Sequence, residues 1–482
     1  MQRRHLLKGL GATGAGLLLN GCLPQGGRSS RALAMEGADL ALPRGLHVSL
    51  DDDSHTTRSL TWFTDGAEAP GSWLEFDTVT PQMSAEDVQS MPLSMRVAAD
   101  ADPTFGVEAV THRATARDID PDAPFRYRVG SPDGGWSPVH VVQPSPRDTW
   151  RFVHFGDHGI THRSQQLTQQ LRREPHDLLL IAGDISYADG NQPIWDEWFG
   201  INEPLLSRVP MMCGPGNHEE KDGTGAAFKN RFTHPNPLTS NIFGSNPGST
   251  FYSFDYNRMH FLVTTAGALI GDLTLPEELL AIETDLALAA ARRAAGQIDF
   301  IFVVQHFTIW TDQIGRGPAN PTLVALEENI MLRYGVDALL VGHDHIYQRS
   351  VPMALGLPNP LGYVQVTVGT GGQSIRLFEE GERQRWSAAD FIGVGYTRFE
   401  VDGTTVRGEY VGVPPVDLSD EGRQNTQGDF AVVDQFTIEA KPRLLLGQFA
   451  VPPRGADILL ADYDAIARHT RERNYHALHH CG

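Results

Sequence analysis

The chain has 482 residues, with 39 lysines and arginines against 59 aspartates and glutamates, so its formal net charge is −20. This charge excludes nucleic acid as a partner held by general attraction and makes an anionic membrane surface unfavourable. Apolar residues make up 40% and charged residues 20%, as in soluble globular proteins. A phosphate site on this chain must therefore be a local island of positive charge, and a metal ion is one way to create it.

Residues 1–22 predict an export signal. Arg3 and Arg4 precede a short segment of Gly, Ala and Leu, a pattern that resembles a twin-arginine signal. The segment ends in LNGC, which resembles a lipoprotein cleavage box with Cys22 as the lipidated residue. The asparagine is atypical of such boxes, so two alternatives stay open at Cys22, a lipid anchor or none. The chain is predicted to be exported, as a periplasmic protein, a membrane-anchored lipoprotein or a secreted protein.

Residues 23–42 are small and polar and predict a linker. From residue 43 to residue 146, short alternating segments are separated by clusters of Asp, Gly, Pro and Ser. This texture predicts an antiparallel β-sandwich. Trp62 and Tyr127 are its expected core aromatics.

Residues 150–440 have a different texture, in which apolar strands alternate with helices. The alternation predicts an α/β domain with buried, largely parallel strands and with helices at 276–295 and 321–334. Residues 362–440 return to an alternating pattern and predict that the sheet ends in antiparallel strands. The C-terminal extension, residues 441–482, shows no clear pattern, and its role is not predicted.

Five hydrophobic strands of this α/β domain are each followed by a residue type that binds metals. These residues are Asp157 in FGD, Asp184 in AGD, Asn217 in GNH, His306 in VVQH, and His343 and His345 in VGHDH. In α/β folds, ligands collect at the carboxyl ends of the strands, so these side chains are expected to converge. Glycine before several of them allows a close approach to a central ion.

The order of these motifs resembles the metallophosphoesterase superfamily and, more narrowly, the purple acid phosphatases. The motifs G-D-x-G, G-D-x-x-Y, G-N-H-[DE], V-x-x-H and G-H-x-H stand here as Gly156–Gly159, Gly183–Tyr187, Gly216–Glu219, Val303–His306 and Gly342–His345. The preceding sandwich is similar to the fibronectin type III-like domain of plant-type members. The resemblance implies a metallophosphoesterase catalytic domain built as a four-layer α/β/β/α sandwich with mixed sheets.

The resemblance also implies a binuclear metal centre. Fe(III) would be held by Asp157, Tyr187, His345 and a bridging Asp184. A divalent ion would be held by Asp184, Asn217, His306 and His343. A phenol that must lose a proton, with a free pKa of about 10, suits a hard trivalent ion. Oxygen and imidazole ligands fit iron, zinc and manganese alike, so the divalent metal is not predicted.

The implied enzyme is a purple acid phosphatase-like phosphoric monoester hydrolase, in which a metal-bound hydroxide attacks a small phosphorylated substrate at acid pH. His218 is predicted to bind the phosphate or to protonate the leaving oxygen, and the alternative is that it orients Asn217. Plant-type members carry further histidines after the V-x-x-H motif, but this chain has none there. Arg316 stands near that place and is predicted to contact phosphate, unless it is a solvent-facing loop charge.

Two other functions remain open. The altered loop at 306–320 allows a phosphodiesterase or a phytate-type hydrolase at the same site. The alternative of another class is a non-catalytic cell-surface binding protein, in which the β-sandwich carries the binding function. The intact set of seven metal-binding side chains argues against this second alternative, because a domain without catalysis has no physical reason to retain it. The oligomeric state is not predicted.

Overall fold

The computed structural model describes residues 42–66, 71–235, 250–269 and 276–443. The predicted export signal with Cys22, almost all of the predicted linker, and the extension from residue 444 onward lie outside these residues. Among the helices that the structure describes, none has the length and apolar character needed to cross a membrane.

The N-terminal region consists of two antiparallel sheets. Their strands are β1 (Arg44–Ser49), β2 (Arg58–Asp65), β3 (Trp73–Thr78), β4 (Met95–Ala98), β5 (Asp100–Pro103), β6 (Ala109–Ala116), β7 (Phe125–Ser131), β8 (Gly135–Trp136) and β9 (His140–Val142), with the short helix α1 (Ala85–Ser90) between β3 and β4. One sheet has the order β1-β2-β6-β5, and the other has the order β4-β3-β7-β8, with β9 also paired to β7. Trp62 and Tyr127 are fully buried in their shared core, as predicted.

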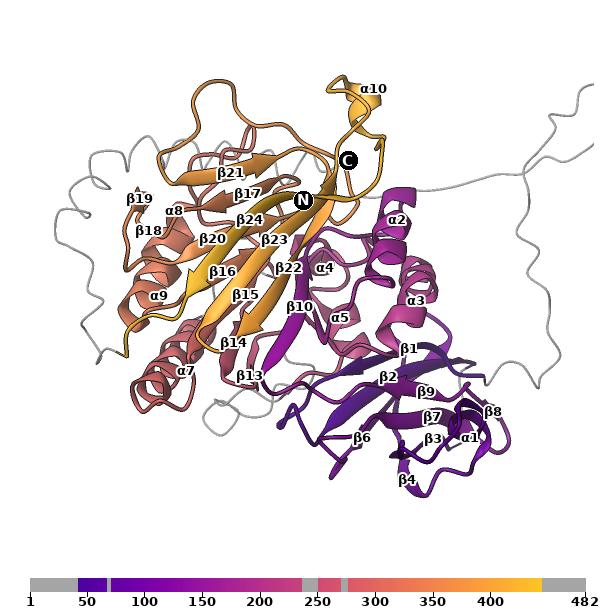
Figure 1. Ribbon diagram of the computed structural model, residues 1–482. Coiled ribbons are helices and arrows are strands. Elements are labelled where there is room, and N and C mark those ends of the chain that lie inside the picture. The colour runs from indigo at the N-terminus through magenta and orange to yellow at the C-terminus, as the bar shows by residue number, and fades with distance from the viewer. Residues whose placement is uncertain (1–41, 67–70, 236–249, 270–275, 444–482) are drawn as a thin grey trace, which may run out of the picture. The chain divides into compact units, whose positions relative to one another are not determined.

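Two mixed sheets form the second part of the chain (Figure 1). The first contains β12 (Met211–Gly214), β11 (Leu178–Ala182), β10 (Thr149–Phe155), β22 (Val394–Asp402), β23 (Thr405–Val413) and β24 (Ala431–Glu439), in this order. The second contains β13 (Tyr252–Tyr256), β14 (Met259–Val263), β15 (Phe300–Gln305), β16 (Ala338–Val341), β20 (Val364–Val368), β17 (Tyr347–Ser350) and β21 (Ser387–Phe391). A small hairpin, β18 (Met353–Ala354) and β19 (Leu357–Pro358), stands apart.

Aromatic side chains fill the space between the two mixed sheets. Phe152 of β10 stacks on Phe399 of β22 with ring centroids 4.5 Å apart, and it meets the edges of Phe261 and Phe302 from the second sheet. Residues of β15 alternate between the two sides: 300, 302 and 304 belong to this inner core, whereas 301 and 303 pack with the helices. Both faces of the second sheet are therefore buried, which explains the continuous apolar strand in the sequence.

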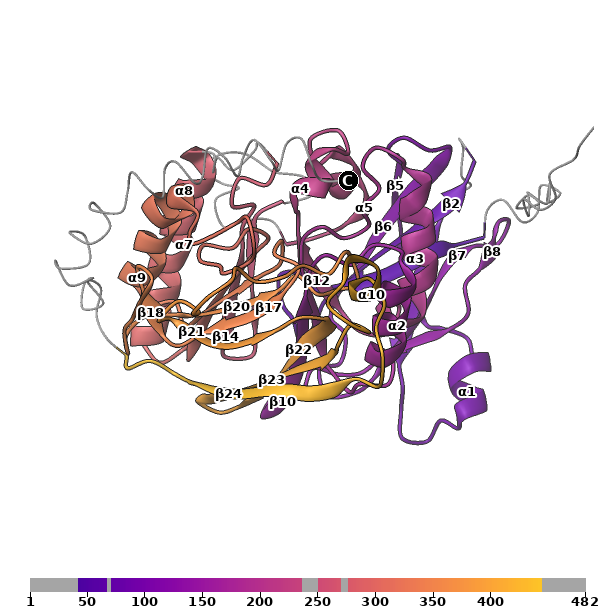
Figure 2. The ribbon, with the colours of Figure 1, turned by 90° about the horizontal axis from the view of Figure 1, so that it is seen from above.

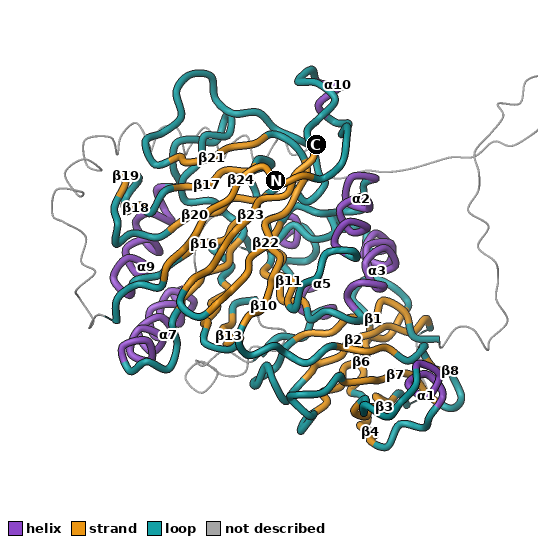
Figure 3. Tube along the Cα trace, in the orientation of Figure 1, coloured by secondary structure: helices purple, strands orange, loops and turns teal. Residues whose placement is uncertain are grey.

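Helices lie on the outer sides of the two sheets (Figures 2 and 3), whereas β24 at the edge of the first sheet is largely exposed. The helices α2 (His162–Leu171) and α3 (Pro193–Leu206) lie beside the first sheet, and α7 (Pro276–Ala294) and α9 (Asn329–Tyr334) lie beside the second. Short helices α4 (Asn217–Glu220), α5 (Ala226–Arg231) and α10 (Asp420–Arg423) sit in the loops. The predicted fold class, an antiparallel β-sandwich followed by a four-layer α/β/β/α domain with mixed sheets, is confirmed.

Two local expectations differ from the structure. The predicted helix at 321–334 consists of α8 (Pro321–Leu323), a π-helical segment (Val324–Glu328) and α9. The π-helical segment ends at Glu328, whose buried carboxylate accepts hydrogen bonds from Trp310 and Tyr363. The last strands were expected to be antiparallel, and β22 to β24 are, but β20 pairs in parallel with β16.

A buried histidine fastens α7 to the β13–β14 hairpin. His260 Nδ1 lies 2.8 Å from Asp255 Oδ1, and His260 Nε2 lies 2.8 Å from Asp285 Oδ2 on α7. Burial disfavours the charged imidazole, but the two carboxylates more than offset this and raise the pKa of His260 to about 9. The hairpin and the helix are thus joined by a charged imidazole.

We expect this contact to make stability depend on pH. The pKa of histidine in an unfolded chain is about 6.5, so the contribution of His260 is complete below that pH and is lost as the pH rises through about 9. The free energy of unfolding should fall by up to roughly 3 kcal/mol over this range, and His260→Gln should flatten the fall. Urea unfolding at a series of pH values tests this. His162→Gln, at the exposed start of α2, is the control, and an unaltered pH profile in His260→Gln would contradict the prediction.

Candidate metal centre

The predicted metal-binding side chains all follow strands of the two mixed sheets. Asp157 comes after β10, Asp184 after β11, Asn217 after β12, His306 after β15, and His343 and His345 after β16. Since β10 to β12 are parallel to one another, as are β14, β15, β16 and β20, the carboxyl ends meet at common edges. The structure brings these residues and Tyr187 together in two adjoining groups.

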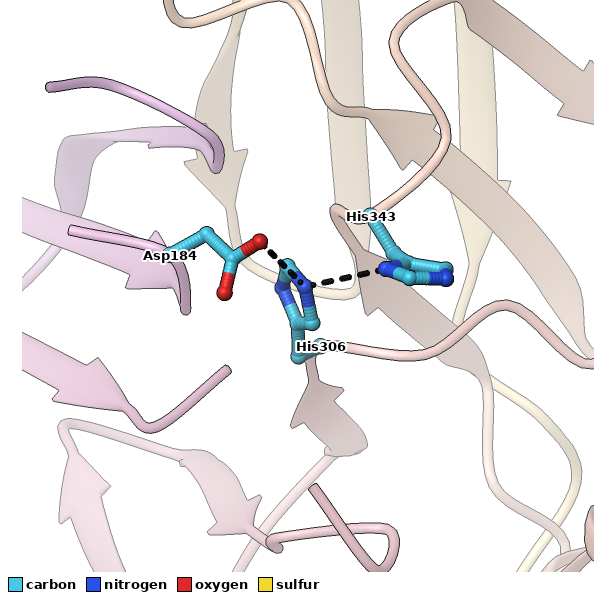
Figure 4. Close-up of side chains that lie close together, drawn as sticks. All are labelled: Asp184, His306 and His343. Atoms are coloured by element: carbon cyan, nitrogen blue, oxygen red, sulfur yellow. Dashed lines mark hydrogen bonds and ion pairs between the residues drawn. The ribbon is translucent and has the colours of Figure 1, made fainter. Parts of the chain in front are cut away.

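The first group surrounds one imidazole nitrogen. His306 Nε2 lies 3.1 Å from Asp184 Oδ2, 3.2 Å from Asn217 Oδ1 and 3.2 Å from His343 Nδ1. Figure 4 shows the His306 ring between Asp184 and His343. Ligand atoms of Asp184, His306 and His343 lie within 4.8 Å of one another, and all three residues are buried.

The orientation of His306 fits a cation at this point. Its Nδ1 lies 2.7 Å from the carbonyl oxygen of Ala182, so Nδ1 carries a hydrogen and the lone pair of the neutral ring is on Nε2. That lone pair faces the oxygens of Asp184 and Asn217, which are themselves acceptors. Burial opposes a charge on the ring, but Asp184 and Asp157 more than offset it and raise the pKa of His306 to about 9. The site attracts positive charge, as a proton or as a metal ion.

The second group has the same design. Tyr187 Oη lies 3.0 Å from Asp157 Oδ1 and 3.2 Å from His345 Nε2, and the latter atom lies 3.1 Å from the same aspartate oxygen. His345 Nδ1 donates to the Ser374 carbonyl oxygen at 2.6 Å, which leaves its Nε2 lone pair facing the group. Burial, followed by Asp157 and Asp184, raises the pKa of Tyr187 well above its usual value. A phenolate at Tyr187 therefore requires a strong cation beside it.

The backbone is strained at four of these residues. The φ angles are 60° at Asp157, 50° at Asp184, 57° at Tyr187 and 64° at His343. Left-handed conformations cost roughly 1–2 kcal/mol for residues with a side chain, and they cluster at functional sites. The surrounding structure holds the four side chains at the centre in spite of this cost.

Two glycines allow the close approach of the turns. A Cβ atom at Gly216 would lie 2.2 Å from Asp184 Oδ1, and one at Gly342 would lie 2.7 Å from Asp157 Oδ2. Only glycine leaves room for the two carboxylates. The predicted role of glycine beside the metal-binding residues agrees with this geometry.

Glu219 joins two of the turns, a role that the sequence did not reveal. Its buried carboxylate accepts hydrogen bonds from the backbone N–H groups of Asp184 at 2.9 Å, Ile185 at 2.9 Å and Gly216 at 2.7 Å. The turn after β11 and the turn after β12 are thereby locked together. The motif G-N-H-[DE] contains Glu219, but only the fold shows which N–H groups donate to it. Two of these donors lie 35 and 34 positions earlier in the chain, and the third lies three positions earlier.

His218 lies at the wall of the centre. Its Nδ1 lies 2.6 Å from Asp189 Oδ1, its backbone N–H donates to Asp184 Oδ1 at 2.8 Å, and its ring centroid lies 4.0 Å from that of Tyr187. Burial lowers the pKa of His218, but Asp184 and Asp189 outweigh burial and raise it. His218 is thus positively charged at acid pH. Asp189 was missed in the sequence, where it is one acidic residue in the segment DISYADG.

A cavity of about 230 Å³ opens above the two groups. Its lining residues are Asp184, Tyr187, Asp189, Asn217, His218, Gln313, Arg316, His343, His345, Gln373, Ser374 and Arg376. Arg316 contacts His343 Nε2, and its Nε lies 3.7 Å from Asp344 Oδ1. The structure therefore places Arg316 at the cavity. Arg376, on the loop after β20, is a second arginine there, and no motif in the sequence indicated it.

Comparison with known proteins shows which proteins this chain resembles. Residues 151–347 match the family profile described as Calcineurin-like phosphoesterase. Purple acid phosphatase 21 of Arabidopsis thaliana is 27% identical over 264 residues, which cover 54% of this chain and 58% of the relative. Human Acid phosphatase type 7 is 26% identical over 347 residues, covering 65% of this chain and 75% of the relative.

The fold has a counterpart among solved structures. The purple acid phosphatase PPD1 from yellow lupin (Lupinus luteus) seeds superposes with a TM-score of 0.69 at 19% identity, covering 86% of this chain and 77% of that one. The chain therefore contains a calcineurin-like phosphoesterase domain. More narrowly, the resemblance to the purple acid phosphatases that the five motifs predicted is confirmed.

We expect Glu219 to be essential to the local structure. Glu219→Ala removes the acceptor of three buried N–H groups, and each unsatisfied group costs about 1–3 kcal/mol. The free energy of unfolding, measured in urea, should fall by about 3 kcal/mol or more. Glu197→Ala, at an exposed glutamate of α3, provides the matched control and should change it little. A Glu219 variant as stable as the control would show that the carboxylate does not hold the turns.

Proposed function

We propose that this chain is a metal-dependent hydrolase that cleaves phosphomonoesters at acid pH. One observation carries the proposal: the lone pair of His306 Nε2 faces the oxygens of Asp184 and Asn217, and that of His345 Nε2 faces an oxygen of Asp157, beside a cavity with a cationic rim. Such an arrangement attracts cations at its base and a phosphate group above them.

The chemistry of the donors fits a pair of metal ions. Asp157, Tyr187, His345 and Asp184 would hold Fe(III). A divalent ion, which is iron, zinc or manganese, is assigned to Asp184, Asn217, His306 and His343. When bound, the two ions would supply the positive charge that holds the phosphoryl group and activates water.

Side chains at the cavity are assigned proton donation and phosphate binding. His218 is charged at acid pH because Asp184 and Asp189 raise its pKa, so it can donate a proton to the leaving oxygen. Arg316 offers a guanidinium to the phosphate oxygens. The small cavity suits a small phosphorylated substrate, and the export predicted from residues 1–22 agrees with an enzyme that works in an acidic surrounding.

A visible absorption band tests the assignment of Tyr187. Protein purified without added ions should contain about two metal ions per chain and show a tyrosinate charge-transfer band. Tyr187→Phe should lose the band, because no phenolate then contacts the ferric ion. Tyr396→Phe, on β22, should keep it. Elemental analysis and absorption spectra measure both. A chain that contains no metal and does not turn over phosphoesters would favour the non-catalytic binding protein instead.

The pH profile of turnover tests the role of His218. Asp189→Asn removes one of the two carboxylates that raise the pKa of His218, so the ring loses its proton at lower pH. The falling limb of kcat/KM for a nitrophenyl monoester should then move to lower pH, by roughly one pH unit. Asp402→Asn, at the exposed end of β22, should leave the limb in place. An unshifted limb in Asp189→Asn would remove His218 as the proton donor.

The second arginine favours a variant of this function, the phytate-type hydrolase. Arg316 and Arg376 come from separate loops and line the same cavity, so a substrate with several phosphates can engage both. Arg316→Ala should lower kcat/KM for all phosphomonoesters about 10- to 100-fold, the loss of a charged hydrogen bond. Arg376→Ala should lower it only for inositol hexakisphosphate. Faster turnover of a bis-nitrophenyl diester than of the monoester would favour the phosphodiesterase.

A further inference from the structure

A second cavity, of about 330 Å³, lies on another side of the first mixed sheet. His176 and Asp177, at its wall, come just before β11, and Pro210 comes just before β12. Asp184 and Asn217 of the candidate metal centre follow the same two strands. The cavity is therefore at the amino ends of these strands, the opposite edge of the sheet from the centre, and it shares no lining residue with the catalytic cavity.

A buried arginine faces this second cavity. Arg58, on β2, is 1% exposed and forms no ion pair with any carboxylate that the structure describes. Its Nη1 donates to the carbonyl oxygens of Ser54 at 2.8 Å and Thr57 at 2.6 Å, and its Nη2 donates to Ser145 Oγ at 3.0 Å. Burial lowers the pKa of Arg58, in keeping with the cost of an unpaired buried charge.

One edge of the Arg58 guanidinium has unused donors. Nε has no hydrogen-bond partner among the described residues, and Nη2, on the same edge, has two hydrogens for one protein acceptor. The Nε and Nη2 edge is the one that pairs side by side with two oxygens of a carboxylate or phosphate. The edge is fixed in place, because Ser145 Oγ in turn donates to the Ser54 carbonyl oxygen at 3.0 Å.

The rest of the second cavity combines charge and apolar surface. The exposed Arg208 lines the second cavity and adds a positive charge. Asp177 adds the one carboxylate of the lining, and its Oδ2 accepts a hydrogen bond from the backbone N–H of Arg151 at 2.8 Å. His176 donates through Nδ1 to the Glu174 carbonyl oxygen at 2.7 Å, and its buried Nε2 has no partner in the described structure. Valines and prolines form much of the remaining wall, Val142 among them.

We propose that this second cavity binds a small organic anion, with its carboxylate or phosphate head on the free edge of Arg58 and its apolar body against the valines. The two arginines outnumber the single carboxylate, which gives the cavity a net positive charge in a chain of net charge −20. The volume exceeds what an inorganic anion fills and falls in the range of small-molecule sites. The site is independent of the proposed phosphatase activity.

Calorimetric titration of the full chain with benzoate and with the non-hydrolysable phenylphosphonate tests the proposal and distinguishes the two head groups. We expect one of the two probes to bind, and we expect Arg58→Lys to weaken its binding at least tenfold. Lysine keeps the charge but loses the paired donors. Arg117→Lys, at an exposed arginine directly after β6, should bind as the unmodified chain does. Turnover of a nitrophenyl monoester should stay unchanged in all of these proteins.

A second variant covers the case in which Arg58→Lys does not fold. Arg208→Glu reverses an exposed charge at the cavity and should weaken binding of the same probe several-fold. Failure of both probes to bind, or equal binding by the unmodified chain and by the folded variants, would overturn the proposal and leave Arg58 as a purely structural residue.

Discussion

The candidate centre depends on one constraint: nitrogen and oxygen lone pairs are forced together in a buried place. At His306 Nε2, a carboxylate oxygen of Asp184 and the amide oxygen of Asn217 approach to within 3.2 Å. Acceptors repel one another unless a cation lies between them. The same negative surroundings raise the pKa of His306. A metal ion would neutralise them more completely than a proton.

Several otherwise separate features serve this constraint. Glycine at 216 and 342 removes atoms that would collide with the carboxylates, and Glu219 anchors the turns that carry Asp184 and Asn217. The left-handed backbone at Asp157 and Asp184 turns their side chains toward the centre. The aromatic layer around Phe152 holds the two sheets at a fixed spacing, so that the carboxyl ends of strands from both sheets open onto one cavity.

Much of this could be predicted from the sequence because its signals are local. Apolar strands, the helix at 276–294, and short motifs such as G-N-H-E all lie within a few consecutive residues. Features that depend on distant segments could not be predicted. Asp189 and Arg376 lie on loops that come together only in the folded chain. The π-helical segment before α9 ends at Glu328, which contacts Trp310 and Tyr363 from other segments of the chain. The fold also decides that β20 runs parallel to β16.

The position of β10 has a consequence for the order in which the protein is made. This strand lies between β11, its near neighbour in the chain, and β22, with Thr149 opposite Asp402. Until the ribosome has released the segment that contains β22, one edge of β10 has no partner and exposes unpaired backbone groups. Such distant pairing slows folding, so the catalytic domain acquires its final form only after most of the chain has been synthesised.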